Sequence, residues 1–136
     1  MFPILILLAG TAFAAPVALA DSAVLAPQEP KTAETMKAYV AEYFADAPVM
    51  VEIARCESHY RHLGVDGEVL RGTVIAADVG VMQINTRYHQ EKADEMGLDL
   101  HSLKGNLAYA RHLYETQGTK PWNASKPCWG KVAIAK

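Results

Sequence analysis

Apolar and polar residues alternate with the period of an α-helix over much of this chain. From Thr32 onward, apolar side chains recur every three or four residues, a spacing that gathers them on one face of a helix. The first predicted helix therefore begins close to Thr32. The residues of its apolar face are Met36, Tyr39, Val40, Tyr43 and Phe44.

A second amphipathic helix is expected immediately after the first. We expect Asp46 to cap its N-terminus, and Pro48 is tolerated in its first turn because the N–H that proline lacks has no partner there. This helix reaches Cys56 and Glu57 near its end. The apolar residues that it is expected to turn inward are Met50, Ile53 and Ala54.

The pattern changes between residues 58 and 85, where glycines separate short stretches of β-branched and other apolar residues. These stretches are 69–70, 73–75 and 79–84. Their shortness, and the glycines between them, favour a small antiparallel sheet or extended loops over a helix.

Helical spacing returns in the last third of the chain. It predicts one helix over 86–96 that Gly97 ends, and another over about 103–117 that Gly118 ends. The tail after Pro121 has no clear period, and we expect it to be irregular. The order of these elements predicts an α+β fold that is mostly α, with a small β element or extended loops between helices.

The N-terminal segment has the composition of an export signal. Residues 1–20 carry no charged side chain, an apolar run at 4–8 precedes small residues, and Ala-Leu-Ala at 18–20 fits a cleavage site. The alternatives are an uncleaved membrane anchor and a start site placed too far downstream, since no Lys or Arg stands near the start. Residues 21–31, rich in Ala and Pro, are expected to form a linker.

Length and charge narrow the class of protein. The chain has 136 residues, with 13 Lys or Arg against 15 Asp or Glu and a formal net charge of −2. One domain, at 32–136, is expected, since domains commonly have about 150 residues. Nucleic acid is not expected as a partner because the chain has no excess of basic residues to contact phosphates.

The predicted export bears on whether the two cysteines form a disulfide. Cys56 and Cys128 are too few for a four-thiolate metal site, and such a pair usually oxidises outside the cytoplasm. We therefore expect a disulfide between them, with two separate buried thiols as the alternative.

Glu57 is the first candidate for chemistry. It lies at the end of a predicted amphipathic helix, where regular structure gives way, so a rigid support can direct its carboxylate toward a cleft. Burial would raise the pKa of this carboxylate, as a general acid that works near neutral pH requires. The alternative is an ordinary solvated Glu at a helix end.

Several tracts together resemble the superfamily of lytic transglycosylases and goose-type lysozymes. Glu57-Ser58 is followed some 20 residues later by Gly-Val-Met-Gln-Ile-Asn at 80–85. Asn106 matches the Asn of the family's third motif, and Trp-Asn-Ala-Ser at 122–125 stands where transglycosylases have Tyr-Asn-Ala-Gly. The resemblance covers about residues 45–130 and implies a lysozyme-like catalytic domain.

The resemblance implies cleavage of the MurNAc–GlcNAc β-1,4 bond of peptidoglycan, with Glu57 as general acid and base. The residues that it implies in substrate binding are Ser58, Gly80, Met82, Gln83, Asn85, Asn106, Trp122 and Asn123. For Gln83 the alternative is a structural amide that bonds loop backbone. Trp122 is a candidate for stacking on a sugar ring, whereas we expect Trp129 in the core.

The reaction depends on whether a second carboxylate assists Glu57. Goose-type lysozymes carry Asp after Met-Gln-apolar, but this chain has Asn85, and an amide cannot act as a base toward water. The resemblance therefore favours the transglycosylase route, which needs one carboxylate. Hydrolysis by a muramidase is the alternative, with Asp66, Glu68 or Asp78 as the partner, although a turn is the default role for Asp78.

Two further classes of protein are alternatives. A zinc site could be formed by Cys56, Glu57, His59, His62 and His89. The chain has no His-Glu-x-x-His tract, however, so we expect no metal and no cofactor. A non-catalytic protein that binds the cell wall is the second alternative.

The expected partner of this chain is the peptidoglycan glycan strand. Contact with a membrane is expected only if the N-terminal segment stays uncleaved. The expected location is periplasmic or secreted.

Overall fold

The computed structural model describes residues 29–133, so the predicted signal peptide at 1–20 and most of the predicted linker lie outside the described residues. The elements, in chain order, are α1 (Ala33–Tyr43), α2 (Pro48–Ser58), β1 (Asp78–Val79), β2 (Ile84–Asn85), α3 (Thr86–Glu95), α4 (Leu103–Gln117), the 3₁₀ helix η1 (Lys120–Ser125) and α5 (Lys126–Ala133). Over this range the chain has an α+β fold that is mostly α, as the residue pattern predicted.

Helix α1 forms where the spacing placed it. Thr32 caps its N-terminus in a reciprocal capping box with Thr35, which gives partners to backbone N–H groups that the first turn leaves free. Met36 and Val40 are buried, whereas Tyr39 is 38% exposed. The buried stripe of this helix is therefore narrower than the apolar pattern indicated.

Helix α2 begins at Pro48, but the prediction that Asp46 caps it is wrong. The N-cap is Ala47, which makes no side-chain hydrogen bond. Asp46 instead accepts two hydrogen bonds from the Arg111 guanidinium on α4, at 3.0 and 2.9 Å, and these bonds lower the pKa of its carboxyl. Arg111 also donates to the Tyr43 carbonyl at 2.8 Å, so it anchors α4 to the end of α1.

The predicted β element is a two-stranded antiparallel sheet. Asp78 pairs with Asn85 and Val79 with Ile84, and single bridges join Leu63 to Val69 and Arg71 to Val79. The stretch 73–75 forms no strand, and the Val74 side chain is 93% exposed. A β-branched residue favours a strand only when its side chain is packed, and here nothing covers it.

Helices α3 and α4 end close to the predicted glycines, Gly97 and Gly118. The tail after Pro121, by contrast, was predicted to be irregular, and this prediction is wrong because η1 and α5 occupy it. Pro121 and Pro127 both stand in the first turn of a helix, where a missing N–H is harmless. Trp129 is buried, as expected, and its indole N–H donates to the Trp122 carbonyl at 3.0 Å.

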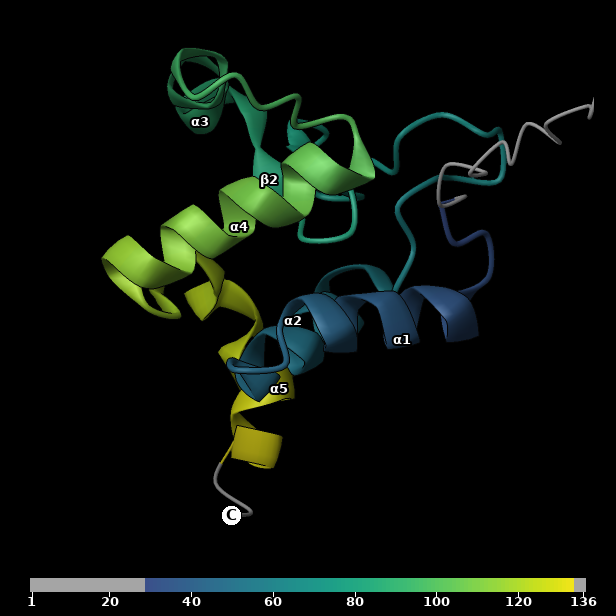
Figure 1. Cartoon of the computed structure of the whole chain (residues 1–136), viewed down its shortest axis with the longest axis vertical. Helices are drawn as coiled ribbons and strands as arrows, with labels where there is room; N and C mark the ends of the chain where they lie inside the picture. The colour runs from purple at the N-terminus through teal and green to yellow at the C-terminus, as the bar shows by residue number, and fades with distance from the viewer. Residues whose placement is uncertain (1–28, 134–136) are drawn as a thin grey trace, which may run out of the picture.

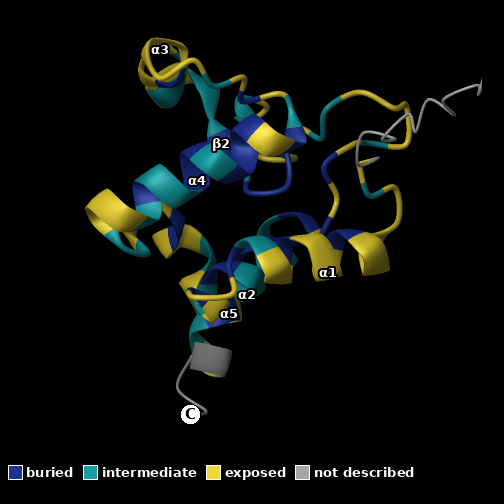
Figure 2. Cartoon of the chain, in the orientation of Figure 1, coloured by how far each residue is buried: buried dark blue, intermediate teal, exposed yellow. Residues whose placement is uncertain are grey.

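The C-terminal segment joins the two halves of the described chain. In Figure 1, α1 and α2 lie in the lower part beside α5, while α4 passes above them toward β2 and α3. Helix α5 packs on α2, and η1 contacts both α2 and α4. Figure 2 shows buried positions on α1, α2 and α4, and the buried apolar residues of these helices belong to one core cluster. No helix among residues 29–133 is long and apolar enough to span a membrane.

Candidate active site

Glu57 lies in the last turn of α2 with its side chain half-buried. Its Oε1 accepts a hydrogen bond from Ser125 Oγ at 2.6 Å. Its Oε2 has no hydrogen-bond partner among the described residues. If Oε2 were fully buried it would be an unsatisfied polar atom, but the one such side-chain atom in this part of the chain is the Tyr60 hydroxyl. Oε2 is therefore not fully buried, so one oxygen of this carboxyl is hydrogen-bonded and the other is in contact with solvent.

The surroundings of Glu57 favour its neutral form. Burial raises the pKa of the carboxyl above its usual value, because the charged form loses contact with water. The hydrogen bond from Ser125 opposes this effect, and the negative charge of nearby Asp78 adds to it. The net shift is upward, in the direction that a general acid near neutral pH needs.

The Asn106 side chain, on α4, holds the tract 80–85 in place through hydrogen bonds. The buried Asn106 side chain accepts from the Met82 N–H at 3.0 Å and donates to the carbonyls of Val79, at 3.0 Å, and Leu100, at 2.9 Å. These bonds give buried backbone groups their partners and fix the turn between the two strands. Gly80, with φ 73°, passes so close that an added Cβ would lie 2.5 Å from Asn106 Nδ2.

Replacing Gly80 by Ala is expected to destabilise the fold by about 2–5 kcal/mol, from left-handed backbone strain plus the collision with Asn106. Gly97→Ala is the matched control, because Gly97 also has positive φ but has no atom within 4 Å of an added Cβ. It should cost about 1–2 kcal/mol. Urea unfolding of both variants measures the difference, and equal losses would contradict a packed contact at Gly80.

The 3₁₀ helix η1 brings the two candidate tracts to one site. The Trp122 indole N–H donates to the Met82 carbonyl at 3.0 Å, and Ser125, three residues later, donates to Glu57. A single turn of η1 thus contacts both the tract 80–85 and the end of α2. These tracts, distant in the sequence, are thus linked through η1.

Of the three candidates for a second carboxylate, only Asp78 acts on the Glu57 pKa. Asp78 lies in β1, and its Oδ1 accepts from the Asn85 amide at 2.7 Å across the sheet. The side-chain Oδ1 of Asn85 caps α3 by accepting from the Arg87 N–H at 3.0 Å. Asp66, another of the three candidates, accepts from the Glu68 N–H at 3.1 Å. A side-chain contact of this local kind is the turn role that was expected of Asp78.

The residues that the resemblance implied in sugar binding differ in their burial. Four of these side chains are buried in the structure: Ser58, Met82, Asn106 and Trp122. Gly80 is buried as well, Gln83 and Asn85 are half-buried, and Asn123 is exposed. Gln83 donates to the Gly80 carbonyl at 2.9 Å, which is the structural amide role named as its alternative.

Ser58 does not contact Glu57. Its hydroxyl donates to the Ala54 carbonyl at 3.0 Å and accepts from the Arg61 N–H at 3.2 Å, so it terminates α2. The hydroxyl beside the acid is that of Ser125, which belongs to the Trp-Asn-Ala-Ser tract but was not predicted as a site residue. The signal that could have found it is its position three residues after Trp122, on the same face of a helix.

Cys56 and Cys128 form a disulfide, as predicted, with an S–S distance of 2.05 Å. The bond joins the residue before Glu57 to α5, the helix that directly follows Ser125. Two separate buried thiols are thereby excluded. The disulfide fixes the distance between the end of α2, which carries Glu57, and the start of α5, which directly follows Ser125.

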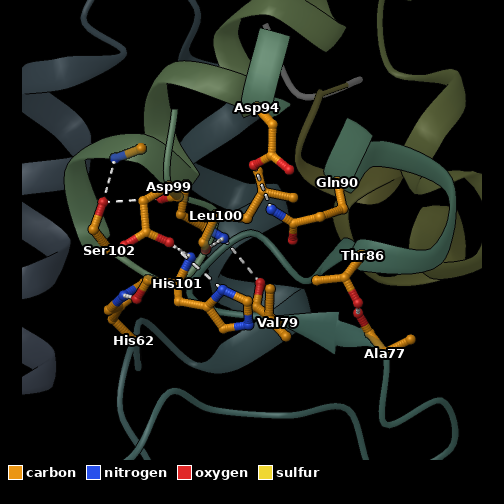
Figure 3. A network of polar contacts seen from close by, with 12 residues as sticks. His62, Ala77, Val79, Thr86, Gln90, Asp94, Asp99, Leu100, His101 and Ser102 are labelled. Atoms are coloured by element: carbon orange, nitrogen blue, oxygen red, sulfur yellow. Dashed lines mark hydrogen bonds and ion pairs between the residues drawn. The ribbon is translucent and has the colours of Figure 1, made fainter. Parts of the chain in front are cut away.

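Four of the five residues considered as zinc ligands, Cys56, Glu57, His62 and His89, have other partners. Buried His62 bridges the His101 carbonyl, at 2.9 Å from its Nε2, and the Val81 N–H, which donates to its Nδ1 at 3.3 Å. Figure 3 shows the contact between His62 and His101 within the network around Asp99 and Ser102. Within residues 29–133, no group of three or more His, Cys, Asp or Glu could hold a metal ion.

A pocket of about 700 Å³ lies between the start of α1 and residues 60–67. Its lining includes Tyr60 but not Glu57. The candidate acid is therefore outside this pocket, at the junction of α2 and η1.

Comparison with protein-family models, with curated proteins and with solved structures finds no match for this chain.

Proposed function

We propose that this chain is a lysozyme-like enzyme of the cell wall, a peptidoglycan lytic transglycosylase with Glu57 as its general acid and base. The observation that carries the proposal is the double contact of η1, through Trp122 with the Met82 carbonyl and through Ser125 with Glu57. It supports one site built from the same tracts whose sequence resembles the family. Placement of these tracts on opposite faces would have removed the basis for the proposal.

The proposed reaction uses Glu57 twice. The neutral carboxyl donates its proton from Oε2 to the glycosidic oxygen, which leaves as the hydroxyl of GlcNAc, and the N-acetyl group of MurNAc stabilises the cation that develops at C1. Glu57, now ionised, takes the proton of the C6 hydroxyl of the same MurNAc while O6 bonds to C1. The products are a free GlcNAc end and a 1,6-anhydro-MurNAc end, and Glu57 is neutral again.

Hydrolysis of the same bond is the second candidate function, and Asp78 is the observation that favours it. Its carboxylate is near enough to raise the pKa of Glu57, and Asn85 donates a hydrogen bond to it. A glycosidase of the common type requires a second carboxylate, which acts as base or nucleophile. A protein that binds the wall without cleaving it is the remaining alternative.

The disulfide supports a location outside the cytoplasm. Such bonds persist in oxidising compartments and are rare where thiols are kept reduced. We propose a periplasmic or secreted protein, in which the glycan strands are within its reach.

Digestion of purified sacculi in water enriched in heavy oxygen separates the three functions. A transglycosylase releases muropeptides whose mass is lower by one water than that of reducing ends, and these carry no heavy oxygen. A muramidase releases reducing ends labelled with heavy oxygen. Binding to sacculi without released muropeptides would leave only the non-catalytic alternative, and we expect the unlabelled anhydro products.

A further inference from the structure

We propose that Ser125 is the positioning residue of the acid, holding Oε1 of Glu57 so that the reactive proton resides on Oε2. This inference rests on the proposed function, since it assigns Ser125 a part in the same reaction. It places the hydroxyl partner of the acid 68 positions further along the chain, at a place where the family's Tyr-Asn-Ala-Gly pattern has glycine.

The geometry makes the two oxygens of Glu57 unequal. Ser125 Oγ lies 2.6 Å from Oε1, a short distance for a hydroxyl and an oxygen of a carboxyl group. Because Oε1 accepts this hydrogen bond, a proton on the carboxyl is better placed on Oε2. Oε2 is also the oxygen that solvent reaches and that has no other partner among the described residues. A glycosidic oxygen can approach Glu57 from that side.

The same hydroxyl has a second acceptor within range. Ser125 Oγ lies 3.1 Å from the Trp122 carbonyl, so its single hydrogen has two places to go. When Glu57 is ionised, donation to Oε1 stabilises the carboxylate that must next act as a base. When Glu57 is neutral with its proton on Oε2, the same donation to Oε1 persists. The serine can therefore donate to Oε1 in both protonation states of Glu57.

The neighbouring elements keep Ser125 in place. Trp122 is buried, and its indole N–H is bonded to the Met82 carbonyl, while Cys128 is tied to Cys56. Ser125 therefore stands between two fixed points on the same helical segment. A hydroxyl on such a support loses little freedom when it bonds the acid, which is the condition for precise positioning.

Other charged groups around Glu57 do not replace this contact. Within residues 29–133, Asp78 is the one other side chain that acts on the Glu57 pKa, and it acts in the opposite direction to Ser125. Removing the Ser125 hydroxyl should therefore leave burial and the Asp78 charge unopposed, and the pKa of Glu57 should rise. A serine that does not donate to Glu57 in solution would leave this pKa unchanged.

The test measures the Glu57 pKa directly, by carbon-13 NMR titration of the full chain, with Glu57→Gln to assign the resonance. In Ser125→Ala we expect the pKa to rise by about one unit, the basic limb of the pH–rate profile on sacculi to move with it, and kcat to fall roughly tenfold with little change in KM. Ser125→Thr should restore all three. Lys126→Ala, on the exposed neighbouring residue, should behave as the parent chain.

The outcomes separate this proposal from the proposed function. An unchanged Glu57 pKa in Ser125→Ala, or no recovery in Ser125→Thr, overturns the role of Ser125. Ser125→Gly removes the same hydroxyl and is the second variant if Ser125→Ala does not fold. If the parent chain releases no muropeptide but the pKa moves as expected, the proposed function fails while the hydrogen bond between Ser125 and Glu57 is upheld.

Discussion

Replacing Glu57 by Gln is expected to abolish cleavage of sacculi, with the rate reduced by at least about 10³-fold, because the amide has no acidic proton to donate. The fold should persist, since Gln has the same shape and can still accept from Ser125. Release of soluble muropeptides, followed by mass spectrometry, measures the loss. Glu91→Gln, an exposed carboxylate on α3, is the matched control and should retain full activity.

The same substitution should stabilise the fold at neutral pH. Because the pKa of Glu57 is raised in the folded state, the folded chain holds a proton that the unfolded chain has already lost as the pH rises. Stability therefore falls as the pH rises from the ordinary Glu value to the raised one. A glutamine at this position does not ionise and has no such penalty, so the melting temperature of Glu57→Gln should exceed that of the parent at pH 7 and match it near pH 4. Undiminished muropeptide release would rule out Glu57 as the acid.

The second large effect is expected from removal of the disulfide in the double variant Cys56→Ser, Cys128→Ser. The bond closes a loop between residues 72 positions apart, and the chain-entropy model assigns such a loop roughly 4 kcal/mol of stability. For a domain of this size, that loss should lower the melting temperature by about 15–30 °C. Calorimetry of the double variant beside the parent chain measures the change.

The parent chain in reductant is the control for the double variant. It should melt at nearly the same temperature as the variant, since both lack the bond. If the variant and the oxidised parent melt together, the disulfide adds nothing to stability, and the role assigned to it is wrong. Activity at a temperature where the variant stays folded then reports whether the bond also helps to hold Ser125 against Glu57.

Elements with strong local signals could be predicted from the sequence. Helix α4 has an unbroken apolar period and ends at Gly118, so its bounds follow from spacing alone. The two-stranded sheet was expected because glycines interrupt a β-branched region, and Glu57 was found as a carboxylate at the end of an amphipathic helix. Cys56 and Cys128 had only each other as partners once export was assumed.

The features that were missed depend on tertiary contacts. Asp46 has the right chemistry for a cap, but Arg111, 65 positions away, takes its carboxylate. The tail was expected to be irregular because its prolines hid its helical period. Once the tail is helical, Trp122 turns inward to the Met82 carbonyl, and Ser125 meets Glu57. No local rule in a single sequence reveals such contacts.

The position of residues 122–129 late in the sequence determines when, during synthesis, the parts that contact Glu57 become available. Residues 122–129 contain the hydroxyl that holds the acid, both indoles of the core and one half of the disulfide. A ribosome delivers these residues after every other described element except the last turn of α5. A polypeptide cut short before Trp122 would carry Glu57 without the parts that orient it. The proposed activity therefore requires residues 122–129, and cleavage of the chain within this stretch is expected to abolish it.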